Sequence, residues 1–165
     1  LRGTWDFAQT TVAFPPVLYN RKCPVPGLIH LAEPAIEDLD KLFQKPSASY
    51  TAEASDFRKL QYEPKYRWYR KVVTISPGGP DAEVMLTILK SQFVTQVYVN
   101  GRDMGQSVSC ATPVRLKITE AVRWNEPNEI LIRVGERIWL PPEAAGGTDK
   151  EKANYLPGYG MQATW

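Results

Sequence analysis

The chain has 165 residues and a mass of 18.6 kDa, which suits a single domain that buries about 70% of the surface of its unfolded chain. Hydrophobic residues make up 43% and charged residues 23%, and these proportions exclude a disordered or fibrous chain. The net charge of +2 comes from 20 basic and 18 acidic side chains that are interspersed, so nucleic acid is not an expected partner.

The chain contains no apolar run near the roughly 20 residues that a membrane-spanning helix needs, so no membrane partner is expected. Its start lacks the pattern of a signal peptide, and because the first residue is Leu1 rather than Met, a removed leader or a longer precursor is compatible with the sequence. The two cysteines, Cys23 and Cys110, are expected to be buried free thiols, and pairing in an oxidising compartment is the alternative. With one histidine, they cannot form a four-ligand zinc site.

Short segments between turn residues fill the first half of the chain. The stretch GTWDFAQ, residues 3–9, predicts a strand in which Trp5 and Phe7 point the same way. The Pro-rich residues 14–34 are interpreted as a loop over the surface. An amphipathic helix is predicted from Pro34 to a point before Pro46, because apolar residues recur there at helical spacing: Ile36, Leu39, Leu42 and Phe43.

The second half of the chain reads as a succession of strands. They are predicted at residues 66–75, 82–89, 113–119 and 128–135, with one helical turn and a tight reversal between the last two. Residues 94–105 predict a hairpin with a type I′ turn at Asn100-Gly101. Counting outward pairs Val99 with Arg102, Tyr98 with Asp103, and Val97 with Met104. Strands without intervening long helices predict an all-β antiparallel sandwich with one or two short helices.

The sequence offers little material for catalysis. His30 lies between apolar neighbours in GLIHLAEP and is interpreted as a packed or hydrogen-bonded structural residue rather than a catalytic base. The chain has no Gly-rich phosphate loop that ends in Lys-Ser or Lys-Thr, and none of its acidic residues stands in a context typical of a proton donor.

The sequence offers more candidate residues for ligand binding than for catalysis. Trp5, Trp68 and Trp124 are expected in the core, whereas Trp139 and Tyr155 accompany a long Pro/Gly-rich loop and could stack on a sugar ring. In the same loop, the sequence predicts a cluster that could hydrogen-bond to a polyol, formed by Asp149, Lys150 and Glu151. The alternative is that these residues are a solvated run of charges. A structural calcium ion on this acidic loop is a weaker alternative, because the ligand spacing is missing.

The order of the segments resembles a known family. YRWYRKVVTI, VMLTILKSQFVTQVYVNGRDMGQ, PVRLKITEAVRWNEPNEILIRVG and GTDKEKANYLPGYG look like the N-terminal sugar-binding domain of glycoside hydrolase family 2 enzymes, the β-galactosidase, β-glucuronidase and β-mannosidase group. The resemblance covers roughly residues 66–160, and its most specific part is the VYVNG hairpin with the later N-x-I-x-I-x-V strand, while LRGTWDF fits the usual opening of the domain. The family's closing Gly-Ile-Trp strand is replaced here by GYGMQATW.

This resemblance implies a galactose-binding-like jelly roll that spans residues 1–165 as one domain of a larger, periplasmic or secreted glycosidase. In the family the catalytic carboxylates belong to a separate TIM barrel that follows an immunoglobulin-like domain, so this chain alone is expected to lack hydrolase activity. Asp149 matches, by order along the chain, the acidic loop residue that contacts substrate in the family. The alternatives are an autonomous carbohydrate-binding module and a structural or protein-docking sandwich domain, since a fold does not settle a function.

Overall fold

The computed structural model describes residues 1–37, 66–91, 94–107 and 112–135. In these residues the chain forms strands and two short 3₁₀ helices, η1 and η3, and thus an all-β antiparallel sandwich, as predicted. The elements are β1 (Gly3–Thr10), β2 (Arg21–Val25), η1 (Ile29–Leu31), β3 (Tyr66–Thr74), β4 (Met85–Ile88), β5 (Thr95–Val99), β6 (Arg102–Ser107), β7 (Val114–Lys117), η3 (Thr119–Ala121) and β8 (Pro127–Val134).

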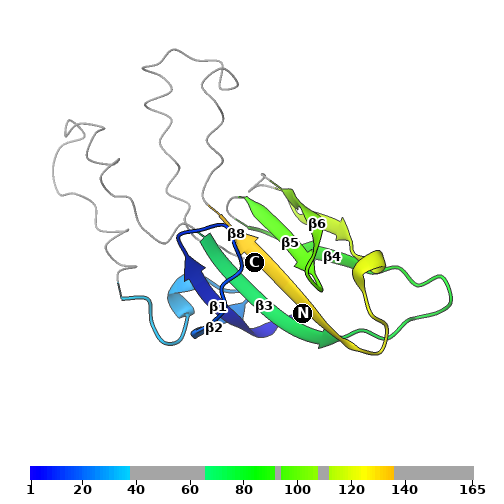
Figure 1. Cartoon of the computed structure of the whole chain (residues 1–165), viewed down its shortest axis with the longest axis horizontal. Helices are drawn as coiled ribbons and strands as arrows, with labels where there is room; N and C mark the ends of the chain where they lie inside the picture. Colours follow the sequence, from blue (N-terminus) through cyan, green and yellow to red (C-terminus); the bar gives the residue numbers. More distant parts are fainter. Residues whose placement is uncertain (38–65, 92–93, 108–111, 136–165) are drawn as a thin grey trace, which may run out of the picture.

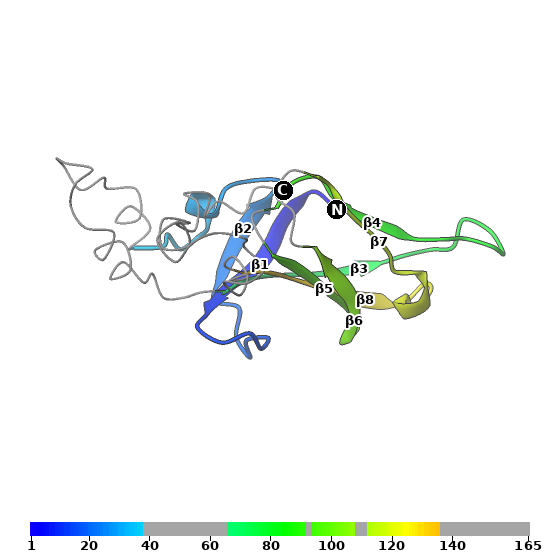
Figure 2. The ribbon, with the colours of Figure 1, turned by 90° about the horizontal axis from the view of Figure 1, so that it is seen from above.

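The strands form two layers. A six-stranded sheet has the order β2-β1-β3-β8-β5-β6, and a two-stranded sheet pairs β4 with β7 (Figures 1 and 2). All pairings between these strands are antiparallel. In the part of the chain that is described, no helix is long and apolar enough to cross a bilayer.

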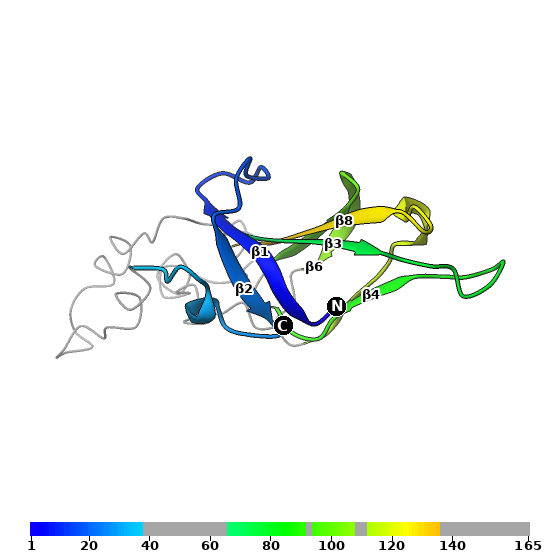
Figure 3. The ribbon, with the colours of Figure 1, turned by 90° about the horizontal axis from the view of Figure 1, so that it is seen from below.

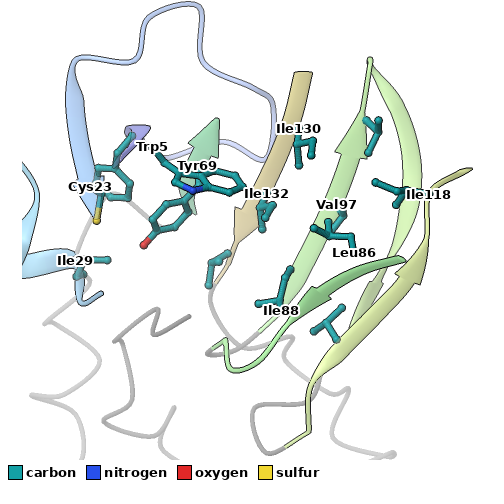
Figure 4. Close-up of a cluster of buried hydrophobic side chains, with 14 of the residues drawn as sticks. Trp5, Cys23, Ile29, Tyr69, Leu86, Ile88, Val97, Ile118, Ile130 and Ile132 are labelled. Atoms are coloured by element: carbon teal, nitrogen blue, oxygen red, sulfur yellow. The ribbon is translucent and has the colours of Figure 1, made fainter. Parts of the chain in front are cut away.

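The core lies between the two layers, because alternate residues of each strand point inward. Along one row of the large sheet, Phe7 pairs with Tyr69, Tyr69 with Ile132, and Ile132 with Val97, and all four side chains are buried. Leu86 and Ile88 of β4 face this row from the small sheet (Figure 4). Each such buried aliphatic side chain stabilises the fold by about 1.5–3 kcal/mol.

Strand β2 corrects one prediction, because residues 21–25 lie in the Pro-rich passage that was interpreted as loop. Cys23 is fully buried opposite Trp5, so this segment contributes to the core. Pro24 has no N–H for a ladder, but β2 is the edge strand of its sheet and tolerates the missing donor. The proline signal therefore indicated an edge strand rather than a loop.

The predicted helix after Pro34 receives no support in its described part. Residues 34–37 are not helical, and the remainder of the predicted helix, together with residues 47–64, lies outside the described residues. The other predicted elements are confirmed: each strand predicted at residues 3–9, 66–75, 82–89, 113–119 and 128–135 is present, and η3 is the predicted helical turn.

The hairpin of β5 and β6 follows the predicted register only near its turn. Val99 faces Arg102 and Tyr98 faces Asp103, but Val97 faces Gly105 instead of Met104, because the register shifts by a bulge. The Asp103 carboxylate accepts a hydrogen bond from the Gly105 amide at 2.8 Å, and Gly105 has a φ of 111°, a value that glycine adopts readily. The bulge therefore has a local cause in Asp103 and Gly105.

Two asparagines join the hairpin turn to the start of β8. The Asn100 side-chain amide donates to the Asn128 Oδ1 at 2.8 Å and to the Ala121 carbonyl at 2.7 Å. Asn128 is fully buried; its Nδ2 donates to the carbonyls of Arg123 and Glu126, and its Oδ1 also accepts from the Arg123 amide. These contacts join the VYVNG hairpin to the N-x-I-x-I-x-V strand.

Candidate carbohydrate-contacting surface

The residues predicted to contact carbohydrate lie outside the described part of the chain. These are Trp139, Asp149, Lys150, Glu151 and Tyr155. Their grouping around a sugar, and the calcium alternative in the same loop, therefore stay predictions. Among the described residues, no group of three or more His, Cys, Asp or Glu side chains is placed to hold a metal ion.

The described residues do show where the predicted loop departs from the sheet. Strand β8 ends at Val134, and the amide of Gly135 donates to the Val94 carbonyl, just before β5, at 2.8 Å. A Cβ built on Gly135 would approach the ring of Tyr66, the first residue of β3, to 3.2 Å. The chain thus leaves β8 between the starts of β3 and β5, at what we call the open end of the six-stranded sheet.

An arginine stacked on aromatic rings lies on the outer face of the sheet at the open end. The guanidinium of Arg133 sits 5.3 Å from the ring centre of Tyr66 and 5.9 Å from that of Trp68. Trp68 in turn stacks on Tyr98 with ring centres 6.1 Å apart. We call Tyr66, Trp68, Tyr98 and Arg133 the arginine–aromatic cluster. Trp68 is fully buried, whereas Tyr66, Tyr98 and Arg133 stay partly exposed. Exposed rings and a guanidinium are groups that proteins use to contact sugar rings and planar or anionic ligands.

The cluster also holds the loop of residues 11–20, which connects β1 to β2. The Trp68 indole N–H donates to the Thr10 hydroxyl at 2.9 Å, and that hydroxyl donates to the Val12 carbonyl at 2.6 Å. Arg133 Nη1 donates to the Ala13 carbonyl at 3.0 Å. Figure 3 shows this loop rising from β1 on the side of the large sheet that faces away from β4. The outer face is therefore covered in part by this loop.

A row of alternating charges crosses the outer face from β2 to β8. Lys22 pairs with Asp6, the Arg70 guanidinium lies 3.5 Å from Asp6, and the Arg70 Nε donates to Glu129 at 2.6 Å. Glu129 raises the pKa of Arg70, mainly through this hydrogen bond. Because these side chains stay partly exposed, each pair contributes little to stability, about 0–1 kcal/mol, and the row can still exchange partners with a polar ligand.

Tyr19 ties the loop to this row. The Arg70 guanidinium lies over its ring at 5.6 Å from the centre. Desolvation by burial, with a further contribution from the charge of Glu129, raises the pKa of Tyr19 to about 12. The phenol is therefore neutral and contacts the sheet through its ring face.

The aromatic, histidine and cysteine predictions have mixed outcomes. Trp5 and Trp68 are buried and Cys23 is a buried free thiol, as predicted, while Cys110 lies outside the described residues. Trp124 is partly exposed, so its assignment to the core is wrong. The interpretation of His30 as packed is also wrong, because η1 buries Ile29 and turns the adjacent His30 into solvent.

The arginine–aromatic cluster and the charge row were missed from the sequence. A signal existed in YRWYRKVVTI, where Tyr66, Trp68 and Arg70 alternate and therefore share a face. Their partners come from β1, β5 and β8, which are distant in sequence. Only the strand order brings them together.

The described residues place the molecule in the class of antiparallel β-sandwich domains. The fold is similar to that of solved β-glucuronidases. The enzyme of Dictyoglomus thermophilum is 20% identical with a TM-score of 0.55, and the match covers 86% of this chain and 20% of that chain. The enzyme of Faecalibacterium prausnitzii is 19% identical with a TM-score of 0.57, and the match covers 84% of this chain and 21% of that chain. The enzyme of an uncultured Clostridium sp. is 16% identical with a TM-score of 0.56, and the match covers 84% of this chain and 22% of that chain.

The chain spans about a fifth of the length of these solved β-glucuronidases. At identities of 20% or less, the likeness shows the fold and not the activity. No protein-family model matches the chain, and no curated protein is significantly similar to it in sequence.

Proposed function

We propose that this chain is a non-catalytic, carbohydrate-binding-like domain of a larger family 2 type glycoside hydrolase. The observation that carries the proposal is the fold likeness to β-glucuronidases, which covers 86% of this chain but only 20% of the Dictyoglomus enzyme. The sequence resemblance over residues 66–160 supports the same assignment, because its most specific motif joins Asn100 to Asn128 in the structure.

In this proposal the sandwich supports a catalytic barrel, and the segment after β8 contributes a loop to the substrate cleft. The geometry of the open end favours this role, because the chain leaves Gly135 beside Tyr66 and Val94 rather than in the middle of a sheet face. A loop that starts from a rigid strand end is well placed to position a recognition residue. Asp149 is the residue that we assign to substrate contact, with Lys150 and Glu151 beside it.

The alternative is an autonomous carbohydrate-binding module that holds sugar through exposed aromatic side chains. Trp139 and Tyr155 would stack on the ligand, and the stacked Tyr98 shows that the described sheet also presents partly exposed aromatic surface. A third possibility, a structural or protein-docking sandwich, requires no sugar contact.

The first experiment tests the proposal in the full-length polypeptide that the gene encodes. Hydrolysis of 4-nitrophenyl glycosides, including the β-glucuronide, is compared for the wild type and for Asp149→Asn. Loss of a charged hydrogen bond to substrate lowers kcat/KM by about 10–100-fold. Asp81→Asn, in the exposed turn between β3 and β4, is the matched control and leaves the rate unchanged. A full-length polypeptide without any glycosidase activity contradicts the proposal.

The second experiment distinguishes the proposed domain from an autonomous carbohydrate-binding module. The 165-residue chain, shown to be folded by circular dichroism, is titrated with a panel of mono- and oligosaccharides. The proposal expects no glycoside turnover and no binding tighter than millimolar. Tighter binding that is lost in Trp139→Ala or Tyr155→Ala, but kept in the control Trp124→Ala, supports the autonomous module instead.

A further inference from the structure

An uncharged loop with exposed apolar side chains lies between β1 and β2. Residues 10–20, TTVAFPPVLYN, contain no charged side chain. Within them, four large apolar side chains point into solvent: Val12 is 55% exposed, Phe14 75%, Val17 105% and Leu18 73%. The other large exposed apolar side chains among the described residues are spread singly over the molecule: Leu1, Leu31, Val72, Met85 and Leu89. Single exposed apolar residues are ordinary, whereas a cluster indicates an interaction surface.

The loop is held in place rather than collapsed onto the sheet. Hydrogen bonds from Trp68 to Thr10 and from Arg133 to the Ala13 carbonyl fix its first half, and the stack of Arg70 on Tyr19 fixes its second half. These anchors use the polar groups and the Tyr19 ring, which leaves the apolar side chains pointing outward. Because a partner would not have to order this loop, binding costs less conformational entropy than for a free segment.

Polar residues surround the apolar side chains. Arg21 and Lys22 follow the loop directly, and the partly exposed Asp6 and Arg70 lie beside its second anchor. An apolar centre with a charged rim is the composition of protein–protein interfaces. It argues for a folded protein partner with an apolar recess.

The size of the patch favours a partner on the same polypeptide. Four side chains of this kind expose on the order of 500 Å², less than the roughly 800 Å² that each partner of a stable complex buries. A second copy of the chain would therefore bind weakly through this patch alone. A covalently linked domain needs less area, because its effective concentration is about millimolar or higher.

We infer that the loop of residues 11–20 is a preorganised docking element that inserts Phe14, Val17 and Leu18 into an apolar recess of another domain of the same polypeptide. The inference rests on the proposed function, in which the domain is part of a longer enzyme. It adds the surface through which the sandwich attaches to the rest of that enzyme.

The test measures thiol accessibility in the full-length polypeptide. Phe14→Cys and Leu89→Cys each add one thiol to the chain, at two positions that are similarly exposed in this domain, 75% and 68%. Each variant is treated with a maleimide, and labelling at the introduced cysteine is followed by peptide mass mapping. Docking slows labelling at position 14 by at least about tenfold relative to position 89, because only locally opened molecules react. Val17→Cys is the second variant and keeps the test decisive if Phe14→Cys does not fold.

Equal labelling rates at positions 14, 17 and 89 overturn the inference. Protection that disappears on dilution also overturns it, because it would assign the loop to a second copy of the chain or another separate partner. The two experiments together distinguish a failure of this inference from a failure of the proposed function. A glycosidase with fast labelling at position 14 contradicts docking alone, and a polypeptide without glycosidase activity but with slow labelling contradicts the proposed function alone.

Discussion

The end of the six-stranded sheet where β5 turns into β6, which we call the closed end, pairs its buried polar groups with hydrogen bonds inside the chain. Asn128 is fully buried, and both ends of its amide are hydrogen-bonded to the chain. At the open end, by contrast, Arg133 lies over two aromatic rings, and its Nε has no hydrogen-bond partner among the described residues. One end is therefore fixed by a fully hydrogen-bonded network, whereas at the other end ring stacking and single hydrogen bonds hold the loop of residues 11–20 against the sheet.

The largest expected effect concerns the closed end. Asn128→Ala removes one acceptor and two donors from a buried network and leaves the Arg123 amide and the Arg123 and Glu126 carbonyls without their partner. Urea unfolding should show a loss of about 3–4 kcal/mol. The control Asn20→Ala, at an exposed position, should change stability by less than about 0.5 kcal/mol. A loss below about 1 kcal/mol at Asn128 would mean that the network does not hold this end together.

The second effect concerns the open end. Arg133→Ala removes the hydrogen bond to the Ala13 carbonyl and the contacts with Tyr66 and Trp68. We expect a loss of about 2 kcal/mol together with faster proteolysis within residues 11–20, both measured on the purified chain. Arg115→Ala, at an exposed position of β7, is the matched control. Unchanged proteolysis would contradict the role of Arg133 as an anchor of the loop.

A smaller effect tests the hairpin turn itself. Gly101 has a φ of 80°, and a Cβ added there meets nothing within 4 Å, so Gly101→Ala introduces backbone strain without a clash. The expected loss in urea unfolding is about 1 kcal/mol. Gly79→Ala is an ideal comparison, because that site is equally open but does not have a positive φ. Equal effects at the two glycines would show that the turn conformation is not under strain in the variant.

The last effect is a pH dependence at the loop anchor. The pKa of Tyr19 rises from 10.0 to about 12 on folding, mainly through burial. A raised pKa means that the folded state holds its proton longer than the unfolded state. The contribution is therefore complete below pH 10.0 and is lost as the pH rises toward about 12. In urea unfolding over this range, Tyr19→Phe should lose less stability than the wild type, and parallel curves would contradict the assignment.

Much of the fold could be predicted from the sequence, because local chemistry specifies it. Asn100-Gly101 requires a tight turn, and the alternation of Tyr69 and its neighbours in β3 requires a half-buried strand. The prediction failed where a distant partner decided the outcome. Residues 21–25 form an edge strand because Cys23 packs opposite Trp5. The bulge at Val97 is a different case, because its cause, the contact of Asp103 with Gly105, is local and was overlooked in the sequence.

For the candidate site, too, one part could be predicted from the sequence and another part could not. The loop with Asp149 was proposed from residue types and from the family resemblance, and it stays a prediction because it lies outside the described residues. The arginine–aromatic cluster could not be assembled from sequence, since Arg133 meets Trp68 only after β8 pairs with β3. No local pattern encodes which strands become neighbours in a sheet.

By itself, the sequence determined the all-β class, the turns and most of the strands, because backbone preferences and the alternation of apolar residues act over a few neighbouring positions. The tertiary structure alone decided the order β2-β1-β3-β8-β5-β6 and, with it, which polar side chains share the outer face. The physical reason is that strand pairing is a long-range contact, between residues as far apart in sequence as Arg67 and Val134. It is selected by the packing of the whole core rather than by any one segment.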